Sequence, residues 1–269
     1  MTHLKRVGLF LREILTEQFQ YRHLLFEITA RDIRLRYKQA AMGFGWAVFM
    51  PLLNTAIFGI VFTRMAPIDV GLPYALFAYT GLLAWQLTAS SLRFAVLSLT
   101  TNTNLVTKVY FPREIFPFSA VAVTAVDTAA ASLVLAGMMI YYRVGVTAAV
   151  LVLPAIVLTQ IAFTAGLALL LAMGNLFFRD VKYLFEIALS VWMFASSAVY
   201  PIDRIGGTLG AVLSLNPMTP IINAYRDVLL FGRLPDPAPF TAAAITALAT
   251  LALGWTVFHR AEFSFAENI

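Results

Sequence analysis

The sequence predicts an all-α integral membrane protein, on two observations. First, 60% of the 269 residues are hydrophobic and only 12% are charged, whereas about a quarter of the residues in a soluble domain are charged. A soluble fold of this size has too little polar surface to cover so much apolar surface. Second, several apolar runs approach about twenty residues, the length with which a helix crosses a bilayer core. We therefore expect lipid to be part of the solvent around this chain.

Six apolar segments are long enough to be transmembrane helices. Pro51 interrupts the first of them, and a tight link at Arg143 joins the third to the fourth. The expected spans, within a single transmembrane domain of residues 1–269, are about residues 42–63, 74–95, 118–141, 146–173, 181–199 and 238–258.

The distribution of Lys and Arg indicates the orientation. Placing the N-terminus in the cytoplasm puts most of the basic residues on the inner side, as the positive-inside rule requires. Both termini are then cytoplasmic in a multi-pass protein. The net charge of +5 reflects this arrangement, so we expect no nucleic-acid partner.

The segment of about residues 18–40 is predicted to be an amphipathic helix at the membrane interface. Its apolar positions follow a 4-3-4 spacing, and so do the charged positions beside them. On a helix, this spacing gives an apolar stripe next to a charged ridge. Such a helix lies with its apolar side in lipid and its basic groups near phosphates. The stripe consists of Phe26, Ala30, Ile33 and Tyr37, and the ridge of Glu27, Arg31, Arg34 and Lys38.

Two further segments are neither spans nor ordinary loops. Residues 209–231, on the outer side, contain two short apolar pieces that are separated by Asn216-Pro217 and Thr219-Pro220. We expect a pair of short re-entrant or surface helices there. Residues 104–117, on the inner side, carry Asn104, Lys108, Arg113 and Glu114, with Pro112 and Pro117 as breaks in the chain. They are expected either to form a short helix lying across the membrane face or to be a polar loop.

Several kinds of active site are absent from the sequence. There is no GxxxxGK[ST] or GxSxG motif and no cysteine, and the three histidines lack metal-ligand spacing. We therefore expect no catalytic residue, no metal and no cofactor in this chain. Asp127 is the one acidic residue deep inside a span. It is expected either to pair with a base such as Arg93 or to be a protonated structural carboxyl.

Polar and aromatic residues in the spans allow two interpretations. Polar positions on one face of the second and fifth spans either line a hydrophilic pathway or bond helix to helix. Aromatic rings either face lipid or offer flat surfaces on which sugar rings can stack. If a conduit for sugars exists, its candidate rings are Trp46, Phe49, Phe58, Phe62, Phe185, Trp192 and Tyr200.

Taken together, several stretches resemble one family. They are RDIRLRYKQAAMGFGWAVFMPLLNTAIFGIVF (31–62), NLVTKVYFPREIFP (104–117), FFRDVKYLF (177–185), YP (200–201), LNPMTPIINAYRDVLLFG (215–232) and FHRAEFSFAENI (258–269). In this order, they resemble the membrane subunit of type-2 ATP-binding-cassette exporters of bacterial surface polysaccharides, the O-antigen, teichoic-acid and polyol-phosphate export group.

The resemblance implies a homodimer in the bacterial inner membrane that works with two ATPase subunits, which bind ATP and Mg²⁺. It implies export of a polyprenyl-diphosphate-linked polysaccharide such as O-antigen. Residues 104–117 would be the coupling helix, and residues 209–231 the periplasmic gate helices. The ATPase-coupling residues would be Asn104, Lys108, Phe111, Pro112, Arg113 and Glu114, with Arg179 and Asp180 as a second contact. The lipid diphosphate would be attracted by Arg31, Arg34, Arg36 and Lys38.

Two other functions remain open. The chain could serve a type-2 exporter of a different substrate, such as a capsular polysaccharide, a small lipid or a drug. A membrane enzyme acting on lipid-linked sugars would need paired carboxylates or a metal cluster near one membrane face. Asp127, Asp180 and Glu186 form no such set in the sequence, so an enzyme is disfavoured.

Overall fold

The computed structural model describes residues 20–38, 40–62, 70–108, 111–202 and 205–265. All regular secondary structure in these residues is helical, which confirms the all-α fold class. The helices are α2 (Arg22–Tyr37), α3 (Gly45–Ile60), α4 (Tyr74–Thr101), α5 (Thr103–Lys108), α6 (Ile115–Tyr141), η2 (Ala148–Val152), α7 (Leu153–Phe177), α8 (Val181–Phe194), α9 (Gly207–Ser214), α10 (Met218–Leu229), α11 (Pro237–Ala261) and η4 (Glu262–Ser264).

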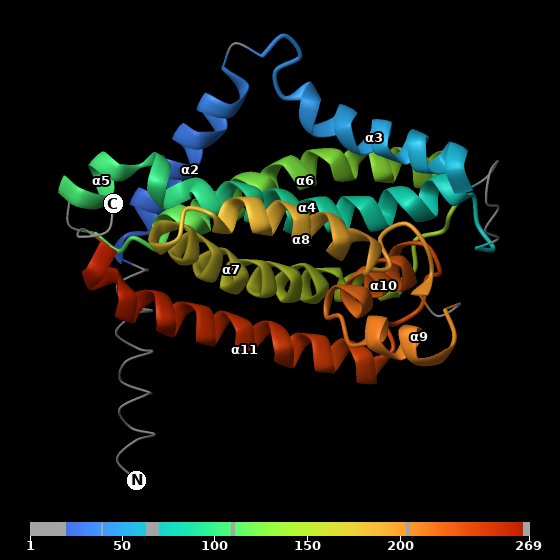
Figure 1. Cartoon of the computed structure of the whole chain (residues 1–269). Coiled ribbons are helices and arrows are strands. Elements are labelled where there is room, and N and C mark those ends of the chain that lie inside the picture. The colour runs from blue at the N-terminus through green and yellow to red at the C-terminus, as the bar shows by residue number, and fades with distance from the viewer. Residues whose placement is uncertain (1–19, 39, 63–69, 109–110, 203–204, 266–269) are drawn as a thin grey trace.

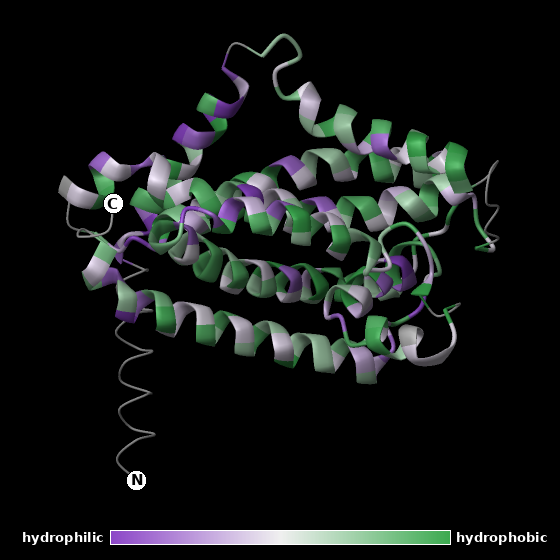
Figure 2. Cartoon of the chain, viewed as in Figure 1, coloured by the Kyte–Doolittle hydropathy of each residue, from purple (hydrophilic) through white to green (hydrophobic). Residues whose placement is uncertain are grey.

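Among the described residues, four helical segments are long and apolar enough to cross a membrane. They are α4, α6, η2 with α7, and α11 with η4. Figure 1 shows them running roughly alongside one another, with α5 at one end of the bundle and α9 and α10 at the other. In Figure 2, hydrophobic residues predominate along these helices, whereas hydrophilic residues gather on α2. The chain is thus an all-α membrane protein.

The first and fifth predicted spans are shorter in the structure. The α3 helix has 16 residues and α8 has 14, so they reach about 24 Å and about 21 Å, below the thickness of a bilayer core. Pro51 was expected to interrupt the first span, but it lies inside a continuous α3. Residues 18, 19 and 39 of the predicted interface helix, and residue 63 of the first span, lie outside the described residues.

The α4 helix continues beyond the end predicted for the second span. Hydroxyl groups in its last turns donate to carbonyls of the same helix: Ser98 to Ala95, and Thr100 and Thr101 to Leu97. These bonds let polar residues extend the helix to Thr101, because each hydroxyl finds a local acceptor. The helix is therefore longer than the span predicted at about residues 74–95.

Residues 209–231 form two short helices, as predicted. The break between α9 and α10 includes Asn216 and Pro217. Thr219-Pro220 was expected to break the chain as well, but both residues lie in the first turn of α10. Proline is tolerated there, because the amide groups of a first turn have no intrahelical acceptor.

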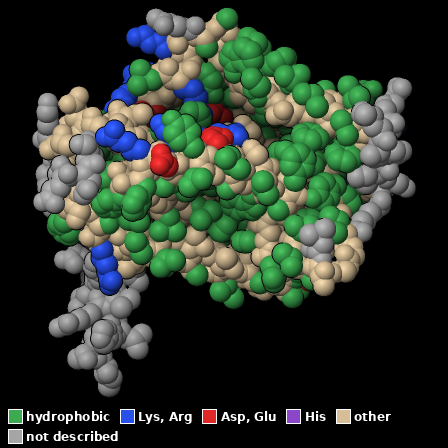
Figure 3. All heavy atoms as spheres, viewed as in Figure 1, with side chains coloured by type: hydrophobic (Ala, Val, Ile, Leu, Met, Phe, Trp, Pro, Cys, Tyr) green, Lys and Arg blue, Asp and Glu red, His purple; other side chains and the backbone are tan. Residues whose placement is uncertain are grey.

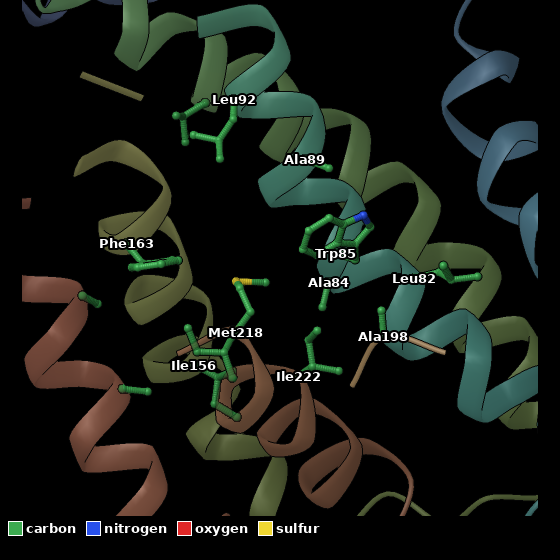
Figure 4. Close-up of a cluster of buried hydrophobic side chains, with 14 of the residues drawn as sticks. Leu82, Ala84, Trp85, Ala89, Leu92, Ile156, Phe163, Ala198, Met218 and Ile222 are labelled. Atoms are coloured by element: carbon green, nitrogen blue, oxygen red, sulfur yellow. The ribbon is translucent and has the colours of Figure 1, made fainter. Parts of the chain in front are cut away.

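The central helix of the bundle is α4, which packs against α3, α6, α7, α8 and α10. The main buried cluster lies between α4, α7 and α10. Figure 4 shows Met218 and Ile222 of α10 reaching into the space between Trp85 of α4 and Phe163 of α7. The α10 helix therefore belongs to the folded core, although it is too short to cross a membrane.

Glycine permits a close crossing of α7 and α11. A Cβ atom at Gly166 would lie 2.6 Å from the backbone of Thr250 and Leu251, and one at Gly254 would overlap the carbonyl of Gly166. Small residues of this kind let membrane helices pack backbone to backbone. Gly137 of α6, by contrast, has no atom within 4 Å of its Cβ position.

These glycines provide a matched test of the packing. Replacing Gly254 by Ala should destabilise the protein by about 1–3 kcal/mol, because the added methyl overpacks the crossing. Replacing Gly137 by Ala should leave stability unchanged or raise it, since Ala is the better helix former. Thermal unfolding of both variants in detergent measures the difference, and equal stability of the two would contradict the packing account.

Candidate functional site

Polar contacts hold α2 against α6 and the end of α4. Ser119 Oγ of α6 donates to Asp32 Oδ2 over 3.0 Å. The guanidinium of Arg31 donates to Asp32 Oδ1 over 2.8 Å and to Asn102 Oδ1 over 2.9 Å. One basic and one acidic residue of α2 are thereby used to position the helix itself.

The C-terminal end of α2 is fixed by Asp127. Arg36 forms an ion pair with this carboxylate and lies 3.7 Å above the ring of Phe94. Tyr37 donates its hydroxyl to the same carboxylate over 2.6 Å. Burial, reinforced by Asp127, raises the pKa of Tyr37 to about 12, so the phenol stays protonated as a donor. The expected pairing of Asp127 with Arg93 is wrong, because Arg93 instead pairs with Glu186 over 3.1 Å.

The four basic residues expected to attract a diphosphate therefore fall into two groups. Arg31 and Arg36 are engaged with carboxylates of the chain. Arg34 and Lys38 are exposed, and Arg34 donates only to a carbonyl of its own helix in the described structure. An open cavity of about 340 Å³ lies next to α2 and is lined by Asp32, Leu35, Arg36, Phe94, Ser98, Asn102 and residues of α6, and neither Arg34 nor Lys38 lines it. Figure 3 shows this side of the molecule hollowed between α2–α3 and α8, with basic and acidic side chains gathered near α2.

Aromatic rings of α3 and of Phe62, two residues after its end, form two pairs. Trp46 and Phe49 meet edge to face with centroids 5.6 Å apart, and both are exposed. Phe58 and Phe62 stack at 6.3 Å and are partly buried against the core. The first pair thus offers ring surface to a neighbour or ligand, whereas the second mainly packs within the chain.

The predicted rings of α8 and the following turn face inward. Phe185 is only 8% exposed. Trp192 packs against Trp85 and Phe163 and donates its Nε1–H to Asn216 Oδ1 over 3.0 Å. Tyr200 donates its hydroxyl to the carbonyl of Phe194. In this chain, all three are used in packing or in holding the turn after α8.

A different stripe of α8 is exposed and apolar, and the prediction from the sequence missed it. Its helical spacing is visible in the sequence, but nothing there shows which face of α8 the core covers. The stripe consists of Tyr183, Leu184, Ile187, Val191 and Phe194.

A buried arginine closes the end of the bundle at which α9 and α10 lie. Arg226 of α10 is 2% exposed. Its guanidinium donates to the carbonyls of Phe77, Ser197 and Ala198 over 3.3, 2.6 and 2.8 Å, and it stacks 3.6 Å above the Phe77 ring. A methyl group at Gly81 would overlap both the Ala198 carbonyl and this guanidinium.

The segment between α5 and α6 is tied to the end of α11. Arg113 donates to the carbonyls of Glu262 and Val106 over 2.7 and 3.1 Å, and its backbone N–H donates to Glu262 Oε1 over 2.9 Å. Glu114 is 1% exposed, and its Oε1 lies 3.1 Å from His259 Nδ1. We call residues 111–114 the elbow.

These contacts separate the predicted coupling residues. Phe111, Pro112 and Glu114 are buried inside the chain, and Arg113 is half-buried. Asn104 is exposed, as are Arg179 and Asp180 before α8, while the side chain of Lys108 lies outside the described residues. The structure therefore leaves Asn104, Arg179 and Asp180 accessible to a partner and makes the elbow an internal support.

Three groups at the elbow could also bind a metal. One ligand atom each of Glu114, His259 and Glu262 lies within 4.8 Å of the others. This set was not predictable from the sequence, because Glu114 lies far along the chain from the other two residues. Arg113 supplies a positive charge beside Glu262, so the cluster is already partly neutralised by the chain's own groups.

The sequence matches the family described as ABC-2 type transporter over residues 23–230. The chain belongs to this family. It is similar to the O-antigen export system permease protein RfbA of Myxococcus xanthus, with 28% identity over 95% of this chain and 99% of that protein. A Klebsiella pneumoniae protein of the same name is 28% identical over 91% of this chain and 94% of its own length. The polysialic acid transport protein KpsM of Escherichia coli is 23% identical over 86% of this chain and 91% of its own length.

A double-mutant cycle tests how this ABC-2 transporter subunit holds α2. Arg36→Met or Asp127→Leu alone should cost about 3 kcal/mol, since each leaves the other charge largely buried without its partner. The double variant should cost less than the sum of the two. Thermal unfolding and protease sensitivity of α2 measure the effect.

The exposed pair of Arg93 and Glu186 is the matched control for that cycle. The same cycle there, with Arg93→Met and Glu186→Leu, should give a smaller coupling, because the two side chains are 44% and 51% exposed and the protein desolvates them less. Equal coupling in the two cycles would contradict a special role for Asp127.

The buried arginine gives a second prediction for this ABC-2 subunit. Arg226→Met should lower the unfolding free energy by on the order of 3 kcal/mol, because three carbonyls lose their donor. Arg143→Gln, in an exposed link between α6 and η2, should change stability by less than about 0.5 kcal/mol. Size-exclusion profiles after graded heating in detergent report both, and a stable Arg226→Met protein would contradict the assignment.

Proposed function

We propose that this chain is the membrane subunit of an ATP-binding-cassette exporter that moves a polyprenyl-diphosphate-linked polysaccharide, such as O-antigen, across the bacterial inner membrane. The observation that carries the proposal is the match to O-antigen export permeases over nearly the whole length of both chains. ATP hydrolysis, with its Mg²⁺, belongs to a separate ATPase subunit, and this chain supplies no catalytic group.

In the membrane, α3 and α8 complete six passes, and α9 with α10 forms a re-entrant pair at the periplasmic face. Both termini and α5 are then cytoplasmic, which agrees with the positions of Lys and Arg. Two copies of the chain would pair with their α3 and α8 sides toward each other, so that the exposed apolar stripe of α8 meets the second copy and the exposed rings of α3 face the space between the copies. This pairing would shield from lipid two helices that are short for a bilayer.

The glycan would pass along the ring-bearing side of α3. A sliding polymer needs flat, weak and repeated contacts, and aromatic rings provide them without fixing a hydrogen-bond register. Trp46 and Phe49 are the exposed rings suited to this role. The other candidate rings pack within the chain and would support this surface from below. They are Phe58, Phe62, Phe185, Trp192 and Tyr200.

The lipid carrier would approach along α2. Arg34 and Lys38 are the exposed basic residues on this helix, and they would attract the diphosphate. Arg31 and Arg36 would keep α2 in place through Asp32 and Asp127. The exposed Leu35 and Phe94 beside the cavity would give the lipid chain an apolar surface.

The ATPase subunit would bind α5. Asn104 and Thr107 are exposed on it, and Arg179 with Asp180 would make a second contact. The elbow would pass movement of α5 to α6 and α11, because Arg113 and Glu114 join it to Glu262 and His259.

Deleting the gene tests the function directly. Cells without it should lack the surface polysaccharide and accumulate the lipid-linked glycan on the cytoplasmic side, and expression of the intact chain should restore export. Normal surface glycan in the deletion strain would overturn the proposal.

The coupling role of α5 gives a further prediction. In the complex reconstituted with its ATPase, Asn104→Ala combined with Thr107→Trp should abolish most glycan-stimulated ATP hydrolysis, because the contact loses a hydrogen-bonding group and gains bulk. Thr241→Trp is the matched control, because Thr241 is exposed near the start of α11, at the end of the bundle away from α5. Unchanged coupling in the double variant would show that α5 is not the docking element.

A capsular polysaccharide is the second candidate substrate. The similarity to polysialic acid transport proteins favours it, although the identity of 23% is lower than that to the O-antigen permeases. Chemical analysis of the glycan retained in the deletion strain decides between them, because the two polymers differ in sugar composition and anchoring lipid.

A further inference from the structure

A second cavity opens at the α5 end of the bundle, on a different face of α4 from the cavity beneath α2. Its volume is about 190 Å³. Since liquid water occupies about 30 Å³ per molecule, this space holds a small polar headgroup rather than a length of glycan. It lies between α4, α5, α7 and the start of α8, and the residues that matter for its chemistry are Thr100, Thr103, Asn175, Arg179 and Lys182.

Asn175 is the unusual residue in this cavity. It is 2% exposed, and its Oδ1 has no hydrogen-bond partner among the residues that the structure describes. Buried amides are nearly always paired, because an unpaired one lowers stability. A half-turn of the amide exchanges its oxygen and nitrogen, so the side chain can present either an acceptor or a donor to a hydroxyl in the cavity.

Two cations lie at the edge of the same cavity. Within the described part of the chain, no carboxylate lies within ion-pair distance of Arg179 or Lys182. The Nζ of Lys182 lies 4.8 Å from the ring centre of Tyr183, which leaves its charge unneutralised. The cavity thus combines positive charge with an unpaired amide and two threonines.

We propose that this cavity binds a phosphate-linked headgroup that carries hydroxyls. The phosphate would pair with Lys182, since Arg179 is assigned to the ATPase contact, and a hydroxyl of the attached sugar or polyol would bond to Asn175. The inference rests on the proposed function, since the phosphate-linked first sugar of a lipid-linked glycan has this chemistry. The headgroup of a phospholipid such as phosphatidylglycerol shares it.

The test is calorimetric titration of the full chain in phosphatidylcholine nanodiscs with two probes, glucose 1-phosphate and inorganic phosphate. We expect glucose 1-phosphate to bind more tightly than inorganic phosphate. Lys182→Gln should weaken both by about tenfold, because a charge-assisted contact is lost. Arg260→Gln, an exposed cation on α11 at the same end of the bundle, is the matched control and should change neither.

Asn175→Leu is the discriminating variant. It should weaken glucose 1-phosphate to the level of inorganic phosphate, leave inorganic phosphate unchanged, and raise the unfolding temperature of the unliganded protein, because the unpaired amide is gone. A purely structural Asn175 would instead lower the unfolding temperature when replaced. Thr100→Val, which removes one hydroxyl from the cavity wall, should weaken glucose 1-phosphate selectively.

A second set of titrations, in nanodiscs that contain phosphatidylglycerol, tests the source of the headgroup. If phosphatidylglycerol in the nanodisc suppresses glucose 1-phosphate binding, the phospholipid headgroup is a ligand of this cavity. If it does not, the phospholipid is excluded as the source, and the phosphate-linked sugar of the glycan is the source that the proposal keeps. The proposal is overturned if neither probe binds, if Arg260→Gln weakens binding as much as Lys182→Gln, or if Asn175→Leu has no selective effect. These outcomes are separate from the proposed function, since loss of export in the deletion strain does not depend on this cavity.

Discussion

The structure depends on the pairing of backbone carbonyls where α8 ends. Inside a membrane, each carbonyl that leaves a helix needs a donor from the protein, because lipid offers none. Arg226 donates to Ser197 and Ala198 after α8 and to Phe77 in α4, and Tyr74 donates to the carbonyl of Val199 over 2.6 Å. The chain can therefore leave the helix at Phe194, and α10 becomes part of the core.

The two ends of the bundle are held by different chemistry. At the α9 and α10 end, guanidinium and hydroxyl groups donate to carbonyls, and these contacts persist at any physiological pH. At the α5 end, carboxylates pair with arginine and histidine across α2, the elbow and α11.

Length and apolarity were sufficient to predict the four long helices and the two short ones between residues 209 and 231. Tertiary partners were not predictable in this way. Asp127 pairs with Arg36, 91 positions away, and only the docking of α2 on α6 brings them together. Trp192 is an ordinary interfacial ring in the sequence, and its contact with Trp85 depends on how α8 lies on α4. Glu114 sits in a polar segment, so its burial against His259 could not be inferred without the position of α11.

The crossing of α7 and α11 at Gly166 and Gly254 bears on how such a protein could handle ions. Backbones in direct contact leave no room for a file of water between the two helices, whereas α3 and α8 lie on α4 with their outer faces uncovered. A hydrated polymer could then pass on the side of α3 and α8, between the two copies, while the wall formed by α7 and α11 excludes protons and sodium ions. The membrane potential would then be maintained during export, because ions would not leak through this wall.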